Sequence, residues 1–157
     1  MNMEEQHLHR VTGTVIIYRP DRTYLITKRS RSRKVFPGKW VVPGGGLEVQ
    51  DYIHDKPTHG LQWYGALEKT LRREVKEEVN LEIGEVKYLL DLVFVRPDGI
   101  PVLTLSFYAP YKSGEVKINE ESEDFAWIQA DEVGSYDLIK GIDEEIVMAD
   151  HLINKGE

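Results

Sequence analysis

The order of apolar and polar positions divides the first 46 residues into short strand-like segments. Residues 11–18 and 24–27 are rich in β-branched and apolar side chains, and Pro20-Asp21-Arg22 between them is a turn sequence. This pattern predicts a β-hairpin. Residues 40–42 predict another short strand, which leads into Pro43-Gly44-Gly45-Gly46, and we expect these glycines to form a turn.

A helical period replaces the strand pattern between residues 65 and 79. Leu67, Leu71, Val75 and Val79 recur every four residues, so they form one apolar stripe on a helix. Asn80 follows this stripe, and asparagine tolerates the left-handed conformation that often ends a helix. We therefore expect the helix to end at Val79.

The second half of the chain predicts three strands and a terminal helix. Residues 86–95 and 102–109 are expected to pair as a hairpin around Pro97-Asp98-Gly99. Residues 125–128 predict a short strand, and residues 142–153 an amphipathic helix. This order predicts an α+β fold, with a mixed sheet flanked by helices, and no repeat or linker divides residues 1–157 into more than one domain.

Composition and charge exclude several classes of protein. The chain has 157 residues, of which 41% are hydrophobic and 30% charged, and it carries a net charge of −7. The negative charge argues against binding to a nucleic acid duplex. The absence of a long apolar run argues against a membrane span, and residues 1–6 lack the order of a signal peptide, so we expect a cytoplasmic protein. Without cysteine, the chain has no disulfide, thiol catalysis or cysteine-bound zinc.

Two clusters of charge suggest the chemistry. Five basic residues precede the glycines and indicate either phosphate recognition or a solvated loop: Lys28, Arg29, Arg31, Arg33 and Lys34. Glu74, Glu77 and Glu78 share one face of the predicted helix, where like charges repel each other unless a cation binds. Clustered carboxylates suit Mg²⁺ or Mn²⁺, although such a cluster is more often a solvated face.

Taken together, the glycines and the acidic helix resemble the Nudix hydrolases. Arg73-Glu74-Val75-Lys76-Glu77-Glu78-Val79-Asn80-Leu81 matches the second half of the Nudix box everywhere except at Asn80, where the box has glycine. Pro43-Gly44-Gly45-Gly46-Leu47-Glu48 is similar to its opening, and residues 25–29 resemble the segment that precedes it. The resemblance implies an α/β/α sandwich that hydrolyses a nucleoside diphosphate-linked substrate with Mg²⁺, or with Mn²⁺.

The resemblance also implies roles for individual residues. Glu74, Arg73 and Glu77 are expected to be catalytic, with Arg73 orienting the glutamates. Metal ligands are expected among the carboxylates of Glu74, Glu77, Glu78 and Glu121 and the backbone carbonyl of Gly44. Substrate contacts are expected from Arg29, Arg31, Arg33, Trp63 and Glu48.

The chain departs from the box in its spacing. Arg73 follows Gly45 by 28 residues where the box has 14, so the segment around residues 50–64 carries 14 extra residues. The box glutamate corresponds to Asp51 when counted from Gly45, or to Gly65 when counted from Arg73, and Asp51 is preferred because it keeps a carboxylate.

Trp63 in the extra segment either stacks on a nucleobase or packs on its own domain. His54 and His59 there are weak candidates for metal ligands.

The sequence leaves the substrate open. A nucleoside triphosphate is preferred, with ADP-ribose or another nucleotide sugar as the alternative, and the resemblance to members that act on coenzyme A fails around residues 40–42. A nucleotide-binding module without turnover is a second hypothesis, which the complete set of glutamates disfavours. A homodimer is left open.

Overall fold

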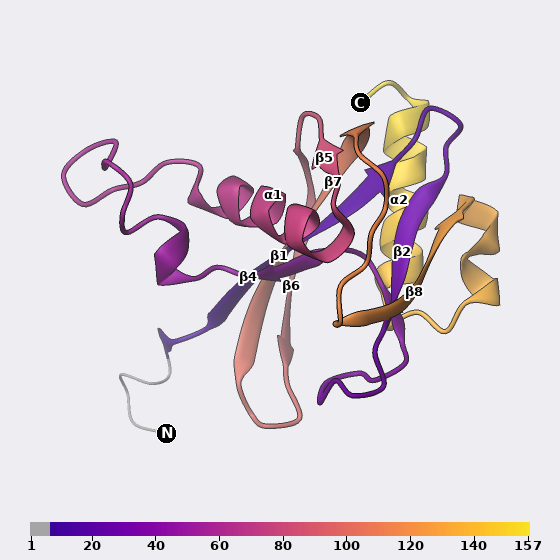
Figure 1. The fold of residues 1–157 in the computed structure, drawn as a ribbon, viewed down its shortest axis with the longest axis horizontal. Coiled ribbons are helices and arrows are strands. Elements are labelled where there is room, and N and C mark those ends of the chain that lie inside the picture. Colours follow the sequence, from indigo (N-terminus) through magenta and orange to yellow (C-terminus); the bar gives the residue numbers. More distant parts are fainter. Residues whose placement is uncertain (1–6) are drawn as a thin grey trace.

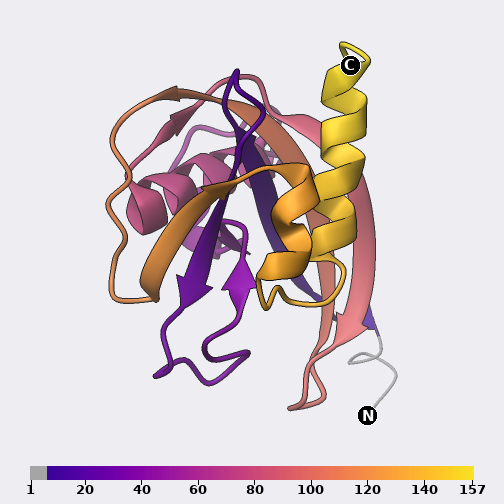
Figure 2. The ribbon, with the colours of Figure 1, turned by 90° about the vertical axis from the view of Figure 1, so that its right-hand side faces the viewer.

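A mixed β-sheet lies between two helices in the computed structural model, which describes residues 7–157. Its strands are β1 (Arg10–Tyr18), β2 (Tyr24–Arg29), β3 (Trp40–Val41), β4 (Gly44–Gly46), β5 (Glu82–Ile83), β6 (Lys87–Val95), β7 (Pro101–Ser113) and β8 (Ser122–Ile128). The helices are α1 (Ala66–Val79) and α2 (Ile142–Asn154). Figures 1 and 2 show α1 and α2 on opposite faces of the sheet.

Strand alternation explains the three layers. Successive side chains of a strand point to opposite faces of a sheet. Val15 and Ile17 of β1 accordingly pack in one core with α1, whereas Ile16 packs in a second core with Ile146 of α2. Because both faces are covered there, residues 15–17 of β1 and 24–26 of β2 are fully buried and apolar without alternation, and the predicted α/β/α sandwich is confirmed.

β1 lies at the centre of the sheet and brings distant segments together. One edge pairs in parallel with β7, so that Thr12 is opposite Thr104. The other edge pairs with β2 at Tyr18 and with β4 at Thr12–Thr14. β2 continues the sheet through β3 and β8, and β7 also pairs with β5 and β6.

The sequence predicted most elements correctly and one wrongly. Gly44–Gly46 form a strand rather than the expected turn, because they pair antiparallel with β1. A Cβ on Gly44 would lie 2.3 Å from the carbonyl oxygen of Gly13, so this pairing admits only glycine there. Sequence reasoning also missed β5 and the short 3-10 helices at Val49–Asp51 and Ala130–Ser135.

Helix α1 ends where its sequence predicted. Asn80 adopts the left-handed conformation (φ 61°), and its amide donates a hydrogen bond to the Lys76 carbonyl. Its side-chain amide also donates to the Glu115 carbonyl, over 3.1 Å. The asparagine therefore serves as the helix end that a glycine would otherwise form.

The sequence predicts neither a signal peptide nor a membrane span. The first prediction concerns residues 1–6, which lie outside the described residues. Within residues 7–157, neither helix is both long and apolar enough to cross a membrane.

Candidate active site

A polar cavity of about 280 Å³ lies between β4, α1 and the basic loop, by which we mean residues 28–34 at the end of β2 and after it. It gathers side chains from segments that are far apart in the sequence. Its lining comprises Arg10, Thr27, Arg29, Arg33, Val41, Val42, Gly44, Gly45, Gly46, Glu48, Glu74, Glu78, Glu121 and Ser122. Seven of the candidate site residues are thus brought together: Arg29, Arg33, Gly44, Glu48, Glu74, Glu78 and Glu121.

The strand of glycines allows α1 to approach the sheet. A Cβ on Gly45 would lie 2.4 Å from the Cδ of Glu74, so only glycine leaves room for that carboxyl group. Glu74 and Glu78 are one helical turn apart and therefore project from the same face. The close contact of α1 with β4 places both of them in the cavity.

The electrostatics of Glu74 and Glu78 reflect their crowding. Burial raises the pKa of Glu78 well above its usual value, and the neighbouring Glu74 raises it further. Burial also raises the pKa of Glu74, although Arg73 opposes this shift. Two buried like charges at this spacing are costly unless a cation lies between them.

The donor set of the cavity fits a hard divalent cation. Carboxylate and carbonyl oxygens are the ligands that such ions prefer, and Glu74, Glu78, Glu121 and Gly44 supply them. As the side chains stand, no three histidine or acidic groups in the described part of the chain converge around one point. The fit therefore rests on ligand chemistry and burial.

Arg73 connects the extra segment to the acidic helix. Its Nε donates to Asp51 Oδ1 over 2.6 Å, and its Nη1 lies 2.9 Å from Glu74 Oε1 and 3.1 Å from Glu77 Oε2. Thr70 and the Glu48 amide also donate to the buried Asp51 carboxylate. Burial alone would raise the pKa of Asp51, but the hydrogen bonds from Arg73, Glu48 and Thr70 lower it to about 2. Arg73 thus pairs with Asp51, the position reached by counting from Gly45, and not with position 65, which is reached by counting back from Arg73.

Glu77 and Glu121 have different surroundings. The Glu77 side chain is 56% exposed and pairs with Arg73, and it does not line the cavity. Glu121 does line the cavity, where its Oε1 accepts a hydrogen bond of 2.7 Å from Arg33. Glu48 also lines it and pairs with Arg10 over 2.7 Å.

The basic loop contributes two of its three predicted arginines. Arg29 lies in the cavity, where burial lowers its pKa, Arg33 lowers it further, and Glu78 and Glu121 oppose the shift. Arg33 lies beside it, so two guanidinium groups face the carboxylates. Arg31 does not line the cavity, because its largely exposed side chain extends towards Glu123 instead.

The extra segment packs on itself and on α1. Trp63 donates from Nε1 to the Asp55 carbonyl over 2.9 Å, and its ring lies 5.3 Å from that of Tyr52. An ion pair between Asp55 and Lys69 holds the segment to the helix. Trp63 packs on its own domain and does not line the cavity, so its contact with substrate stays a prediction. His54 and His59 contact Gln50 and Tyr64 rather than the carboxylates of the cavity.

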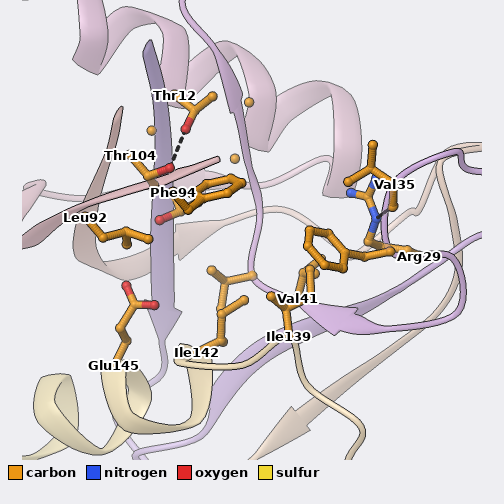
Figure 3. A pocket seen from close by; sticks show the side chains of 16 residues that line it. Thr12, Arg29, Val35, Val41, Leu92, Phe94, Thr104, Ile139, Ile142 and Glu145 are labelled. Carbon is orange, nitrogen blue, oxygen red and sulfur yellow. Dashed lines mark hydrogen bonds between the residues drawn. The ribbon is translucent and has the colours of Figure 1, made fainter. Parts of the chain in front are cut away.

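Sequence reasoning missed a second, apolar cavity of about 270 Å³ beside the first. Figure 3 shows its walls, which come from β1, β2, β3, β4, β6, β7, α2 and the adjoining loops. It shares with the polar cavity Arg29, Val41, Val42, Gly44 and Gly45. Arg10, which lines the polar cavity, was missed as well. Arg10 lies against Gly46 of β4, a contact that the expected turn did not predict, whereas the apolar cavity depends on the packing of α2 against β6 and β7.

Comparison with known proteins identifies the family. The model of the NUDIX domain matches residues 7–149. The nucleoside triphosphatase NudI of Escherichia coli O17:K52:H18 (strain UMN026 / ExPEC) is 32% identical over 132 residues, which cover 75% of this chain and 81% of that protein. The chain therefore belongs to the Nudix hydrolase family, whose members use divalent metal ions, and it acts on phosphoric anhydride bonds.

Solved structures share the fold. The MutT protein of Methanosarcina mazei Go1 has a TM-score of 0.69 at 20% identity, and the match covers 94% of this chain and 96% of that one. The NUDIX domain of Shewanella oneidensis NrtR, solved with ADP ribose, has a TM-score of 0.73 at 17% identity, over 98% of this chain and 94% of that one.

Proposed function

We propose that this chain is a Mg²⁺-dependent pyrophosphohydrolase whose substrate is a nucleoside triphosphate. The observation that carries the proposal is the single cavity in which Glu74, Glu78 and Glu121 face Arg29 and Arg33. Carboxylates there can hold the cation, and guanidinium groups match the geometry of phosphates. The similarity to NudI, a nucleoside triphosphatase, supports the choice of substrate.

Each residue has a defined part in the proposed reaction. Glu74, Glu78 and Glu121 would hold the cation, which offsets negative charge on the phosphates and makes a nearby water more acidic. Arg29 and Arg33 bind the phosphates. Glu74 accepts the proton of the water whose oxygen bonds to phosphorus as the bridging P–O bond breaks. Arg73 orients Glu74.

The nucleoside part of the substrate has a place beside the phosphates. The apolar cavity opens next to the shared Arg29 and is walled by Phe36, Phe94, Leu92 and Ile142. Aromatic and aliphatic side chains favour a flat heterocycle over a charged group. We place the base in this cavity, with the phosphates in the polar one.

A panel of nucleotides tests the reaction and its competitors. We expect phosphate or pyrophosphate release from nucleoside triphosphates with Mg²⁺ and none with a chelator. The ADP ribose complex of the structurally similar NrtR domain makes ADP-ribose the second compound to assay. Faster cleavage of ADP-ribose would favour a nucleotide-sugar pyrophosphatase, and binding without product would favour a nucleotide-binding module.

Two substitutions on α1 test the catalytic assignment. Glu74→Gln and Glu77→Gln each remove a charge without removing volume. Turnover should fall by at least about 100-fold in Glu74→Gln, which loses the base and a proposed ligand of the cation, and by less in Glu77→Gln, which loses a partner of Arg73 outside the cavity, while the fold persists in both. The assay is Mg²⁺-dependent product release, with circular dichroism to confirm folding. The matched control is Glu144→Gln on the exposed side of α2, which should leave turnover unchanged. Wild-type rates in both α1 variants would refute the assignment.

A cytoplasmic location and a single domain spanning residues 1–157 stay predictions of the sequence. The homodimer is likewise a proposal. Light scattering on the purified chain measures the mass of the particle, and a mass near 18.1 kDa would exclude the dimer.

A further inference from the structure

Arg10 of β1 is a third basic group in the polar cavity, and the proposed reaction gives it no part. It lines the cavity together with Arg29 and Arg33. Its Nη2 donates to Glu48 Oε1 over 2.7 Å, and within residues 7–157 its side chain has no other hydrogen-bond partner. A guanidinium group carries five N–H donors, so most of those on Arg10 are available to a ligand of the cavity.

Gly46 of β4 provides the space for this guanidinium group. A Cβ on Gly46 would lie 2.6 Å from Arg10 Cζ, so the group lies directly against the backbone of β4. The preceding residue, Gly45, makes room in the same way for the carboxyl group of Glu74. Two neighbouring glycines therefore admit a guanidinium group and a carboxyl group, and both of these line the polar cavity.

The ion pair between Arg10 and Glu48 can exchange its acidic partner at low cost. The two side chains are 41% and 53% exposed, and exposed pairs contribute about 1 kcal/mol or less. A phosphate offers more negative charge than a carboxylate, and arginine can bind it through two parallel N–H bonds. A phosphate in the cavity can therefore take the place of Glu48.

A second ion pair of the cavity has the same form. Arg33 Nη1 donates to Glu121 Oε1 over 2.7 Å, and both side chains are partly exposed. In the proposed reaction Arg33 binds phosphate and Glu121 holds the cation, so this pair also exchanges partners. Arg10 reaches the cavity from β1 and Arg33 from the basic loop, so guanidinium groups from two distant segments are available to the phosphates.

We propose that Arg10 is a phosphate-binding residue and that Glu48 is the partner which a phosphate of the substrate displaces. The inference rests on the proposed function, because it adds a contact to the same substrate. Glu48, which the sequence predicts as a substrate contact, then opposes binding, because it competes with phosphate for the same guanidinium group.

Arg10→Gln and Glu48→Gln break the same ion pair, so together they separate phosphate binding from a purely structural role. Arg10→Gln loses a phosphate contact, so KM for a nucleoside triphosphate should rise by about tenfold while kcat stays within about threefold. Glu48→Gln loses the competitor, so its KM should be equal to or below the wild-type value. A pair that only stabilised the fold would give the same result in both variants.

Arg96→Gln is the matched control. It removes an arginine from a surface ion pair with Asp98, between β6 and β7, and Arg96 does not line the polar cavity. Its KM should stay at the wild-type value. An unchanged KM in Arg10→Gln, or a raised KM in Glu48→Gln, would overturn the proposal.

A failure of the proposed function would be visible separately, because the wild type would then cleave no nucleoside triphosphate. The probe in that case is inorganic triphosphate, whose binding in the presence of Mg²⁺ is measured by calorimetry. Weaker binding by Arg10→Gln, with no weakening in Glu48→Gln, would still support the phosphate contact. Equal affinities, weaker binding by both variants, or no binding to the wild type would refute it.

Discussion

Asp51 keeps an ion pair at the site although the chain around it is longer than in the Nudix box. Its carboxylate accepts hydrogen bonds from Arg73, Thr70 and its own turn, and its side chain is only 4% exposed. Arg73 in turn contacts Glu74 and Glu77. The extra residues therefore loop outward after Asp51 while the acidic partner of Arg73 is retained.

The low pKa of Asp51 predicts how stability depends on pH. Its folded pKa of about 2 lies below the ordinary value of 3.8, so its contribution is present above pH 4 and is lost as the pH falls towards 2. Asp51→Asn should cost about 2 kcal/mol in the free energy of unfolding at pH 7, and less at pH 3. Urea unfolding at the two pH values measures both effects.

Asp55→Asn is the matched control, since it removes an exposed ion pair with Lys69 in the same segment. Such pairs contribute about 1 kcal/mol or less. Equal costs for the two substitutions at pH 7 would show that the Asp51 pair is no stronger than a surface pair.

Single residues were predictable where the chemistry is local and less so where it depends on packing. Counting from Gly45 led to Asp51, because an ion pair needs only a carboxylate at a suitable distance. The position of Trp63 depends on how the extra segment folds back towards Tyr52, which no local pattern encodes. Arg31 and Arg33 are two residues apart, and only the fold of the loop directs Arg33 alone into the cavity.

Strand β4 shows how an element without side chains can define a site. Its three glycines pair with β1 on one side and lie against α1 on the other. Larger residues at Gly44 or Gly45 would meet different neighbours, namely the Gly13 carbonyl and the Glu74 carboxyl group. The two positions should therefore respond differently to the same substitution.

Gly45→Ala should chiefly affect activity, and Gly44→Ala stability. The new Cβ at position 45 meets a flexible side chain, so Glu74 moves and kcat/KM should fall by about 100-fold with little loss of stability. The new Cβ at position 44 meets backbone, so the free energy of unfolding should fall by about 1–3 kcal/mol. Thermal unfolding and steady-state kinetics on both variants separate these effects. Identical behaviour of the two variants would contradict this view of β4.

Most elements were visible in the sequence because their hydrophobic period is strong. The stripe Leu71, Val75 and Val79 of α1 is fully buried, and residues 15–17 of β1 are apolar on both faces because helices cover both. Strand β4 could not be predicted, because its three glycines carry no hydrophobic pattern and a run of glycines is also typical of turns. The parallel pairing of β1 with β7 joins residues about ninety positions apart, and no local signal specifies it.

At the scale of the whole molecule, the sheet assembles one polar cavity from segments distant in sequence. Arg29 comes from β2, Glu74 and Glu78 from α1, and Glu121 from the loop before β8. The apolar cavity adjoins it at β3 and β4, and Ile142 and Glu145 of α2 form part of its lining. Phosphates and base of one nucleotide can thus occupy neighbouring cavities of opposite polarity.

The central claim is that the carboxylates of the polar cavity form a cation-dependent hydrolytic centre. Glu78 is its most buried carboxylate and its side chain serves no ion pair in the described part of the chain. The decisive measurement is the Mg²⁺-dependent cleavage of a nucleoside triphosphate by Glu78→Gln, beside the wild type and Glu144→Gln. The account predicts a folded variant whose kcat/KM is at least about 1,000-fold lower, with the control unchanged. Wild-type cleavage by Glu78→Gln would contradict it.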